Sequence, residues 1–224
     1  MNKKLFYYTL VLSIVVQIIT GVMDVVAVFI KVPPKAFLIR QLLLLELVVQ
    51  VIEGAFYFWL AYHFTKLSNV TPTRYLDWII TTPTMLVSLI LYLIYLNKKG
   101  DKKDLEFFSL LKEHANVIVP VLVLNWAMLL FGYLGEMKLL SFMTSTLLGF
   151  IPFLIYYYMI YVNYVTTANN GYLLFWYFFG FWALYGVAAV QPYYTKNLFY
   201  NILDLFAKNF FGVFLVYIIL TGNY

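Results

Sequence analysis

Seven long apolar segments, divided by short polar breaks, make up almost the whole chain. They cover residues 5–30, 36–64, 72–96, 105–134, 139–164, 172–190 and 196–220. A helix needs about 20 apolar residues to cross the hydrocarbon core of a bilayer, and each segment is close to that length or longer. Because the breaks are short, consecutive helices must lie antiparallel in a compact bundle. The pattern therefore predicts an all-α, seven-transmembrane-helix bundle that residues 1–224 form as a single domain.

The composition also indicates a protein that lies within a membrane. Of its 224 residues, 64% are hydrophobic and 11% are charged, whereas a soluble domain has about 25% charged residues. The absence of cysteine excludes disulfides and thiol chemistry, and two histidines are too few for a histidine-rich metal site. The net charge of +5 resides in short loops and indicates no nucleic-acid partner. We expect a multi-pass integral protein of the plasma membrane or another cellular membrane, surrounded by the lipid bilayer and without a bound metal.

The basic residues predict the orientation of the bundle. Eight of them lie on the side of the loops that follow the first, third and fifth segments, most densely at residues 98–103, and six lie on the N-terminal side. Cytoplasmic loops carry an excess of lysine and arginine. We therefore expect an extracellular N-terminus, a retained first helix and a cytoplasmic C-terminus.

Five of the ten acidic residues fall inside the apolar segments. These are Asp24, Glu46, Glu53, Asp77 and Asp204. A carboxyl group within a membrane is costly unless it is paired or protonated, so packing alone explains such a set poorly. Glu46, Gln50 and Glu53 share one face of the second segment. We interpret the set as a sign of proton or ion movement, with hydrogen bonding between helices as the alternative for the second segment.

Lys208 lies in the middle of the last apolar segment. A lysine there costs about 2.5–3.5 kcal/mol on insertion, so the amine must be paired or chemically consumed. Asp204 lies four residues earlier, on the same helix face. The two residues fit either a structural ion pair or a Schiff base between Lys208 and a carbonyl ligand, with Asp204 as counter-ion.

The third segment carries polar residues in line along one face. Asp77 and Thr81 are one helical turn apart, and Arg74 lies one turn before them. Ser88 lies eleven residues after Asp77 and returns to nearly the same face, about 16 Å from Asp77 along the helix axis. Such a file can pass a proton between neighbouring groups.

Two motifs together resemble those of the microbial (type 1) rhodopsins, and the resemblance extends over essentially the whole chain. They are Arg-Tyr-x-Asp-Trp-x-x-Thr-Thr-Pro, which begins at Arg74, and Asp-x-x-x-Lys, which ends at Lys208. The resemblance implies all-trans retinal bound covalently to Lys208 as a Schiff base. It implies Asp77 as primary counter-ion and proton acceptor, Asp204 as second counter-ion, and Arg74 as the switch toward the extracellular side.

The same resemblance implies a set of residues around the retinal. On the third, sixth and seventh helices these are Trp78, Thr82, Met85, Trp182, Tyr185 and Ala207, and on the fourth and fifth helices Met128, Phe142, Ser145, Thr146 and Gly149. Two positions depart from the family pattern, because Gly186 replaces the usual proline and Ala189 replaces a tryptophan. We expect the retinal to be held less tightly there, or by another aromatic ring.

A further departure concerns the return of the proton. Ser88 occupies the position at which many outward pumps have an acid, so the motif is Asp-Thr-Ser, with Thr81 in the middle. A serine does not store a proton as a carboxyl does, and Glu46 is a candidate to relay it instead. The Asp-Thr-Ser motif, the short loops, the second-helix glutamates Glu46 and Glu53, and Gly186 are similar to those of the rhodopsins of giant marine viruses.

The predicted function is a light-driven outward proton pump, which moves protons and turns over no chemical substrate, so it is not an enzyme. A light-gated cation channel and a sensory photoreceptor are the alternatives within the family, and a seven-helix transporter without a chromophore is the alternative outside it. The family resemblance also implies a homo-oligomer, either a trimer or a pentamer.

Overall fold

The computed structural model describes residues 3–66, 68–98, 105–166 and 171–224, which form helices and no strands. In chain order these are α1 (Lys3–Val28), the 3₁₀ turn η1 (Pro34–Ala36), α2 (Phe37–His63), α3 (Thr71–Lys98), α4 (Phe107–Glu113), α5 (Ala115–Glu136), α6 (Phe142–Ile160), the π-helical turn η2 (Tyr161–Val165), α7 (Gly171–Ala189), α8 (Tyr193–Asp204), the π-helical turn η3 (Leu205–Asn209) and α9 (Phe210–Thr221). The last three follow one another without a break.

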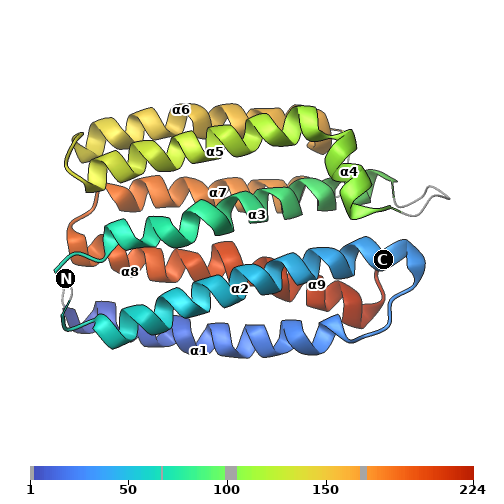
Figure 1. The fold of residues 1–224 in the computed structure, drawn as a ribbon, viewed down its shortest axis with the longest axis horizontal. Helices are drawn as coiled ribbons and strands as arrows, with labels where there is room; N and C mark the ends of the chain where they lie inside the picture. Colours follow the sequence, from blue (N-terminus) through green and yellow to red (C-terminus); the bar gives the residue numbers. More distant parts are fainter. Residues whose placement is uncertain (1–2, 67, 99–104, 167–170) are drawn as a thin grey trace.

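The long helices lie side by side with their axes nearly parallel (Figure 1). Six helical stretches of the described chain are long and apolar enough to cross a membrane: α1, α3, α5, α6 with η2, α7, and α8 with η3 and α9. The seventh is α2, which carries the acids of the second segment and packs against α1, α3 and α9. The predicted seven-helix bundle is confirmed.

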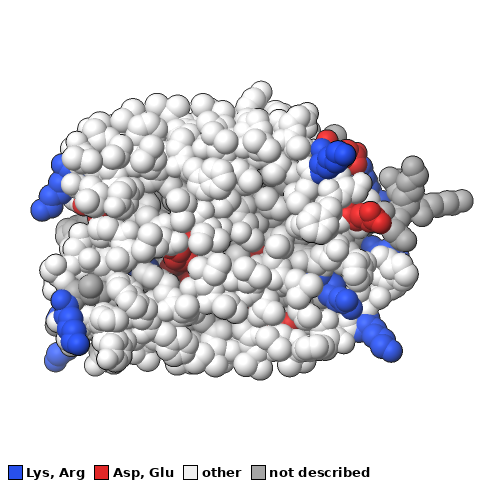
Figure 2. Space-filling view, viewed as in Figure 1, with Lys and Arg blue, Asp and Glu red and all other residues white. Residues whose placement is uncertain are grey.

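The exposed lysines and arginines lie where a bilayer would leave them in water, whereas the acids of the apolar segments are buried inside the bundle. Figure 2 shows lysine and arginine gathered at the two ends of the molecule, while its long side is almost entirely white. Most of the basic group at residues 98–103, on which the predicted orientation depends, lies outside the described residues. The extracellular position of the N-terminus therefore stays a prediction.

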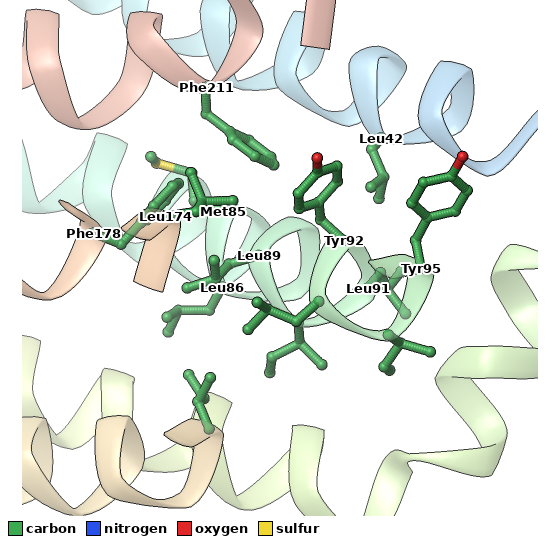
Figure 3. Packing of buried hydrophobic residues seen from close by; sticks show 14 of the residues in the cluster. Leu42, Met85, Leu86, Leu89, Leu91, Tyr92, Tyr95, Leu174, Phe178 and Phe211 are labelled. Atoms are coloured by element: carbon green, nitrogen blue, oxygen red, sulfur yellow. The ribbon is translucent and has the colours of Figure 1, made fainter. Parts of the chain in front are cut away.

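Helix α3 is the central element of the bundle. In its most apolar stretch 67% of the residues are buried, against 28% in α1, α5 and α7. Figure 3 shows Tyr92 of α3 beside Phe211 of α9, and Met85 of α3 close to Phe178 of α7. The ring centroids of Tyr92 and Phe211 are 6.0 Å apart. Because α3 is surrounded by other helices, a polar side chain on its inner face meets protein and not lipid.

The fourth apolar segment is interrupted, where the sequence predicted one helix. Helix α4 ends at Glu113, and His114 separates it from α5 with a non-helical backbone (φ −104°, ψ 14°). The amine of Lys98, at the end of α3, donates a 2.8 Å hydrogen bond to Glu113 Oε1. This bond holds the pKa of Glu113 below its usual range. The charged end of the segment is thus held beside α3 and does not continue in line with α5.

The π-helical turn η3 places the residues around Lys208. A π-turn leaves backbone groups without their usual helical partners. The hydroxyl of Tyr177, on α7, donates a 2.8 Å hydrogen bond to the carbonyl oxygen of Phe206 within this turn. The Tyr177 ring also stacks on Phe210, with ring centroids 4.1 Å apart. Helix α7 therefore supports the turn from which the Lys208 side chain projects.

Candidate functional site

The buried amine of Lys208 is surrounded by three carboxyl groups from three helices. Its Nζ lies 2.5 Å from Asp77 Oδ2, 3.7 Å from Asp204 Oδ1 and 3.8 Å from Glu53 Oε1. The Lys208 side chain is only 3% exposed. The structure thus brings together Lys208, Asp77 and Asp204, as the two motifs implied. The structure also places Glu53 next to the amine. The sequence predicted only that Glu53 lies on the polar face of α2, not that it lies near Lys208.

Arg74 lies beyond Asp204 and is fully buried. Its Nη1 is 3.4 Å from Asp204 Oδ2, and its Nε donates to Asn197 Oδ1 at 3.0 Å. Its Nη2 donates to the side-chain oxygen of Asn201. The guanidinium group of arginine carries five N–H donors in a rigid plane. It suits this arrangement because a different nitrogen contacts each of the three neighbours.

Asp204 is the most heavily hydrogen-bonded acid of the site. Tyr57 donates to its Oδ2 at 2.7 Å and Tyr185 donates to its Oδ1 at 2.6 Å. Together with Arg74, these donors occupy both oxygens of Asp204. In contrast, Asp77 Oδ1 has no hydrogen-bond partner in the part of the chain that the structure describes, so Asp77 can accept a proton without breaking a bond at that oxygen.

The charges of the site do not balance when every group is ionised. Lys208 and Arg74 supply two positive charges, while Asp77, Asp204 and Glu53 supply three negative ones. An excess charge is costly in a site from which water is excluded. Neither oxygen of Glu53 accepts a hydrogen bond from any described residue. Glu53 is therefore the acid best placed to hold a proton at rest.

A cavity of about 110 Å³ extends from Lys208 between α3, α5, α6 and α7. Eleven of the twelve residues predicted to surround the retinal line it: Trp78, Thr82, Met85, Met128, Ser145, Thr146, Gly149, Trp182, Tyr185, Ala207 and Lys208. An amine at one end and a mainly aromatic and aliphatic wall are what a long apolar aldehyde needs. These residues therefore fit retinal.

Phe142 is the exception and does not line this cavity. Its ring lies 3.7 Å below the Lys196 amine, at the border of a second cavity near the end of the bundle. Phe142 is the first residue of α6, and this places it too close to the membrane surface to reach the middle of the bundle. Its place around the retinal stays a prediction, which the lining of this cavity does not support.

The sequence missed several residues that line the main cavity, namely Tyr75, Leu129, Gly132, Phe150, Phe153 and Tyr200. Gly186 and Ala189, which depart from the family pattern, also line it. A Cβ atom on Gly186 would lie 2.5 Å from the Phe150 ring. Phe150 therefore occupies the space that a larger residue at Gly186 would need, and it is the additional aromatic ring that the sequence left unidentified.

The file of polar residues on α3 is only partly continuous. The hydroxyl of Thr81 donates to the backbone oxygen of Asp77 at 3.0 Å. Ser88 is fully buried, and its hydroxyl has no hydrogen-bond partner among the described residues. Glu46, on α2, is 1% exposed and both its oxygens lack a partner. Thr81 therefore belongs to the site of Lys208, whereas Ser88 and Glu46 lie apart from it.

Helix α1 presents a buried polar face that the sequence interpretation overlooked. Its members are Thr9, Ser13, Gln17, Thr20 and Asp24. Ser13 donates to the backbone oxygen of Asn201 at 3.1 Å, and Thr20 accepts from Asn209 at 2.8 Å. The signal was present, because these residues recur every three or four positions within an otherwise apolar segment.

The fold and site together define a seven-helix membrane protein with a buried lysine at the end of a largely apolar cavity. The chain belongs to the family of bacteriorhodopsin-like proteins, whose family model matches residues 5–222. Members of this family bind retinal through a Schiff base. With its membrane-crossing helices, the chain is therefore a microbial rhodopsin and an integral multi-pass membrane protein. No curated protein sequence matches it significantly.

Solved structures of microbial rhodopsins share the fold. The viral rhodopsin OLPVRII is 28% identical, with a TM-score of 0.81, and the match covers 98% of this chain and 99% of that one. The blue light-absorbing proteorhodopsin from Med12 is 19% identical, with a TM-score of 0.75 and coverage of 97% and 98%. The proton-pumping rhodopsin AR2 from the marine alga Acetabularia acetabulum is 18% identical, with a TM-score of 0.75 and coverage of 100% and 97%.

Proposed function

We propose that the protein is a light-driven outward proton pump in which Lys208 carries all-trans retinal and Asp77 accepts the proton. The observation that carries the proposal is the 2.5 Å distance between Lys208 Nζ and Asp77 Oδ2, the shortest of the three contacts between the amine and an acid. Bound to Lys208 as a Schiff base, retinal would supply light absorption and a nitrogen that can give up a proton.

The protein's own residues would hold the chromophore and exclude water. Trp78, Met85 and Trp182 line the cavity next to Lys208 and are each at most 7% exposed. Stiff aromatic walls of this kind restrict the direction in which a bound chain can move. Tyr185 has a second role, because its hydroxyl holds Asp204 while its ring lines the cavity.

The acids differ in their hydrogen bonding, and this difference favours one acceptor for the proton. Asp204 already accepts bonds at both oxygens from Arg74 and two tyrosines. Asp77 has a free oxygen and lies closest to the nitrogen, so it is the acceptor. Arg74 then lies on the far side of Asp204 from Lys208. If that side is extracellular, as the loop charges predict, the proton leaves outward.

A light-gated cation channel is the second candidate, and the polar face of α1 favours it. Glutamine, asparagine and hydroxyl side chains from α1, α2, α8 and η3 meet along much of the length of the bundle, including Ser13, Gln50, Asn201 and Asn209. Uncharged oxygen atoms in such a file can replace part of the hydration shell of a cation. Nothing in the described residues favours a sensory role over these two functions.

The chromophore is tested first. Protein produced with all-trans retinal should show a visible absorption band, and Lys208→Ala should lack it. A band that persists in Lys208→Ala would refute attachment at this residue. The matched control is Lys196→Arg, in which another buried cation is kept and the band should remain.

Currents in voltage-clamped cells then separate the two functions. A pump gives an outward photocurrent that keeps its sign over the ordinary voltage range, and Asp77→Asn should abolish it. A current that reverses with the cation gradient would instead establish the channel. Crosslinking in native membranes would test the expected homo-oligomer, since trimers and pentamers give ladders that end at different sizes.

A further inference from the structure

A second pair of buried acids lies away from Lys208. Asp24 of α1 is 0% exposed and Glu46 of α2 is 1% exposed. No oxygen of either carboxyl has a hydrogen-bond partner among the described residues. The buried cations Lys208, Arg74 and Lys196 pair with other acids. The carboxyls of Asp24 and Glu46 therefore have no paired cation to compensate a negative charge, unlike the acids around Lys208.

The surroundings of the pair are shaped for carboxyl groups. A Cβ atom on Gly212 of α9 would lie 2.9 Å from Asp24 Oδ2, so the Asp24 carboxyl rests directly on the backbone of α9. Gln50 lies near the Asp24 carboxyl and Ser88 lies near the Glu46 carboxyl, without a hydrogen bond between them. The Ser88 hydroxyl is fully buried and has no partner of its own, so it is available to a ligand of Glu46.

The charged groups that face the pair are few. Asp24 is the charged neighbour of Glu46, and no ion pair among the described residues involves either acid. A layer of hydrogen bonds separates the pair from Lys208. In it Gln50 Nε2 donates to Thr20 Oγ1 at 3.0 Å, and Asn209 Nδ2 donates to Gln50 Oε1 at 3.1 Å.

Two neighbouring carboxylates without a cation cannot both be ionised in an apolar site, because each raises the cost of charging the other. The simplest ligand that removes the excess charge is a proton, which needs no coordination shell. A metal ion would need about six oxygen ligands, and no group of three or more acids, histidines or cysteines suited to a metal is found among the described residues.

We propose that Asp24 and Glu46 form a proton-binding carboxyl pair, and that this pair returns a proton toward Lys208 in a protein whose α3 carries Ser88 where a storage acid is expected. A carboxyl O–H bond breaks as the proton crosses the layer of Thr20, Gln50 and Asn209, leaving a carboxylate, and an N–H bond forms at the Lys208 nitrogen that had given its proton to Asp77. A proton from the water on the side of the pair restores the acid. The second half of this proposal rests on the proposed pump, whereas the first half does not.

Infrared difference spectra between wild type and variants, recorded in the dark on the retinal-bound protein in lipid nanodiscs, test the first half. Wild type at pH 7 should show a carbonyl band of a protonated, buried carboxyl that shifts in heavy water. Asp24→Asn and Glu46→Gln should each remove or displace this band, because the proton is shared. Glu113→Gln, at an exposed acid, should leave it unchanged. No change in either pair variant would overturn the proposal, as would a band that responds to sodium at constant pH.

Gly212→Ala offers a test that keeps both acids. The added methyl group should push the flexible Asp24 carboxyl aside and displace its band. Gly21→Ala is the matched control, because a Cβ atom on Gly21 would meet nothing within 4 Å. Equal spectra for both alanine variants would contradict the position assigned to the Asp24 carboxyl.

Flash experiments test the second half. The recovery of the dark absorption band should slow at least tenfold in Asp24→Asn and in Glu46→Gln, and added azide, a small weak acid, should restore it. Unchanged recovery, with the dark infrared band confirmed, would overturn the return role alone. Failure of the pump itself would show differently, as a photocurrent that reverses with the cation gradient.

Discussion

At the scale of single residues, Arg74 organises one side of the candidate site. Its guanidinium meets Asp204, Asn197 and Asn201 through different nitrogens, and Tyr57 lies 3.4 Å from Nη1. A buried cation with this many partners fixes the positions of their side chains and also compensates the negative charge of Asp204. The spacing of donors therefore matters as much as the positive charge.

Arg74→Lys should destabilise the protein although it preserves the charge. An ammonium group cannot reach all of these acceptors, and the loss of one hydrogen bond to a charged group costs about 1.5–3 kcal/mol. Thermal loss of the visible band measures the effect. Arg40→Lys, at a half-buried arginine over the Phe37 ring, is the control and should change stability by less than about 0.5 kcal/mol.

The sequence predicted the charged residues around Lys208 but not their neutral partners. Charged residues are rare within apolar segments, so Asp77, Asp204 and Arg74 stand out in the sequence. Each of them also belongs to one of the two motifs. Tyr57 and Asn201 carry no such signal, because tyrosine is frequent throughout this chain and an asparagine has no characteristic spacing. Their role emerges only when α2 and α8 lie beside α3.

At the scale of the helical element, the turn η3 is the feature with the largest effect on the site. A π-turn changes the rotation of the residues that follow it, so it sets the direction in which the Lys208 side chain projects. Apolar periodicity over one turn is too short to reveal it, and the sequence predicted an uninterrupted helix here. The hydrogen bond from Tyr177 is its support from outside.

Tyr177→Phe should lower stability by about 0.5–1.5 kcal/mol, the net value of one hydrogen bond. It should also shift the absorption maximum, since the turn that holds Lys208 loses its support from α7. Both are measured by absorption spectroscopy with heating. Tyr158→Phe, at a residue of α6 that is 67% exposed, should change neither quantity.

Gly186→Ala should distort the cavity. The added methyl group would lie 2.5 Å from the Phe150 ring, and the ring must move toward the chromophore space. Overpacking of this kind costs about 1–3 kcal/mol, and the absorption maximum should shift with it. Gly180→Ala, on the same helix with nothing within 4 Å, should leave both unchanged. Identical results for the two variants would contradict the contact between Gly186 and Phe150.

At the scale of the whole molecule, the bundle consists of two unlike halves. Helices α5, α6 and α7 pack largely through aliphatic and aromatic side chains, whereas α1, α2 and α8 meet through buried polar groups. Figure 1 shows these two groups of helices on opposite sides of α3. The apolar half lines most of the cavity next to Lys208, and the polar half holds the buried acids Asp24, Glu46, Glu53 and Asp204.

The number, order and approximate bounds of the membrane helices could be predicted from the sequence, because each apolar segment signals its helix independently. The division into halves could not. It depends on which faces of different helices meet, and a polar residue in one segment does not reveal its partner in another. Asp24 illustrates this, since the sequence identified it as costly but gave it no neighbour.

The ion pair between Lys196 and Glu136 joins α8 to α5 across the end of the bundle. The two atoms are 2.7 Å apart, and the side chains are 3% and 4% exposed. Lys196→Met should destabilise the protein by about 3–5 kcal/mol, because Glu136 is left buried and unpaired. The double variant Lys196→Met with Glu136→Leu should recover most of this loss in thermal unfolding. Lys112→Met, at an exposed lysine, serves as control, and no recovery in the double variant would argue against the pair.

The polar face of α1 has a consequence for how this helix inserts. An apolar helix surface can slide along its neighbours at little cost, but the bond that Ser13 donates and the bond that Thr20 accepts from Asn209 can form at one depth only. One inserted residue would turn half of the helix by about 100° and move it by about 1.5 Å. Asp24 would then face the hydrocarbon chains of the lipids. The polar side chains of α1 thus fix both the depth and the rotation of this helix in the bundle. An apolar membrane helix of equal length could not substitute for it.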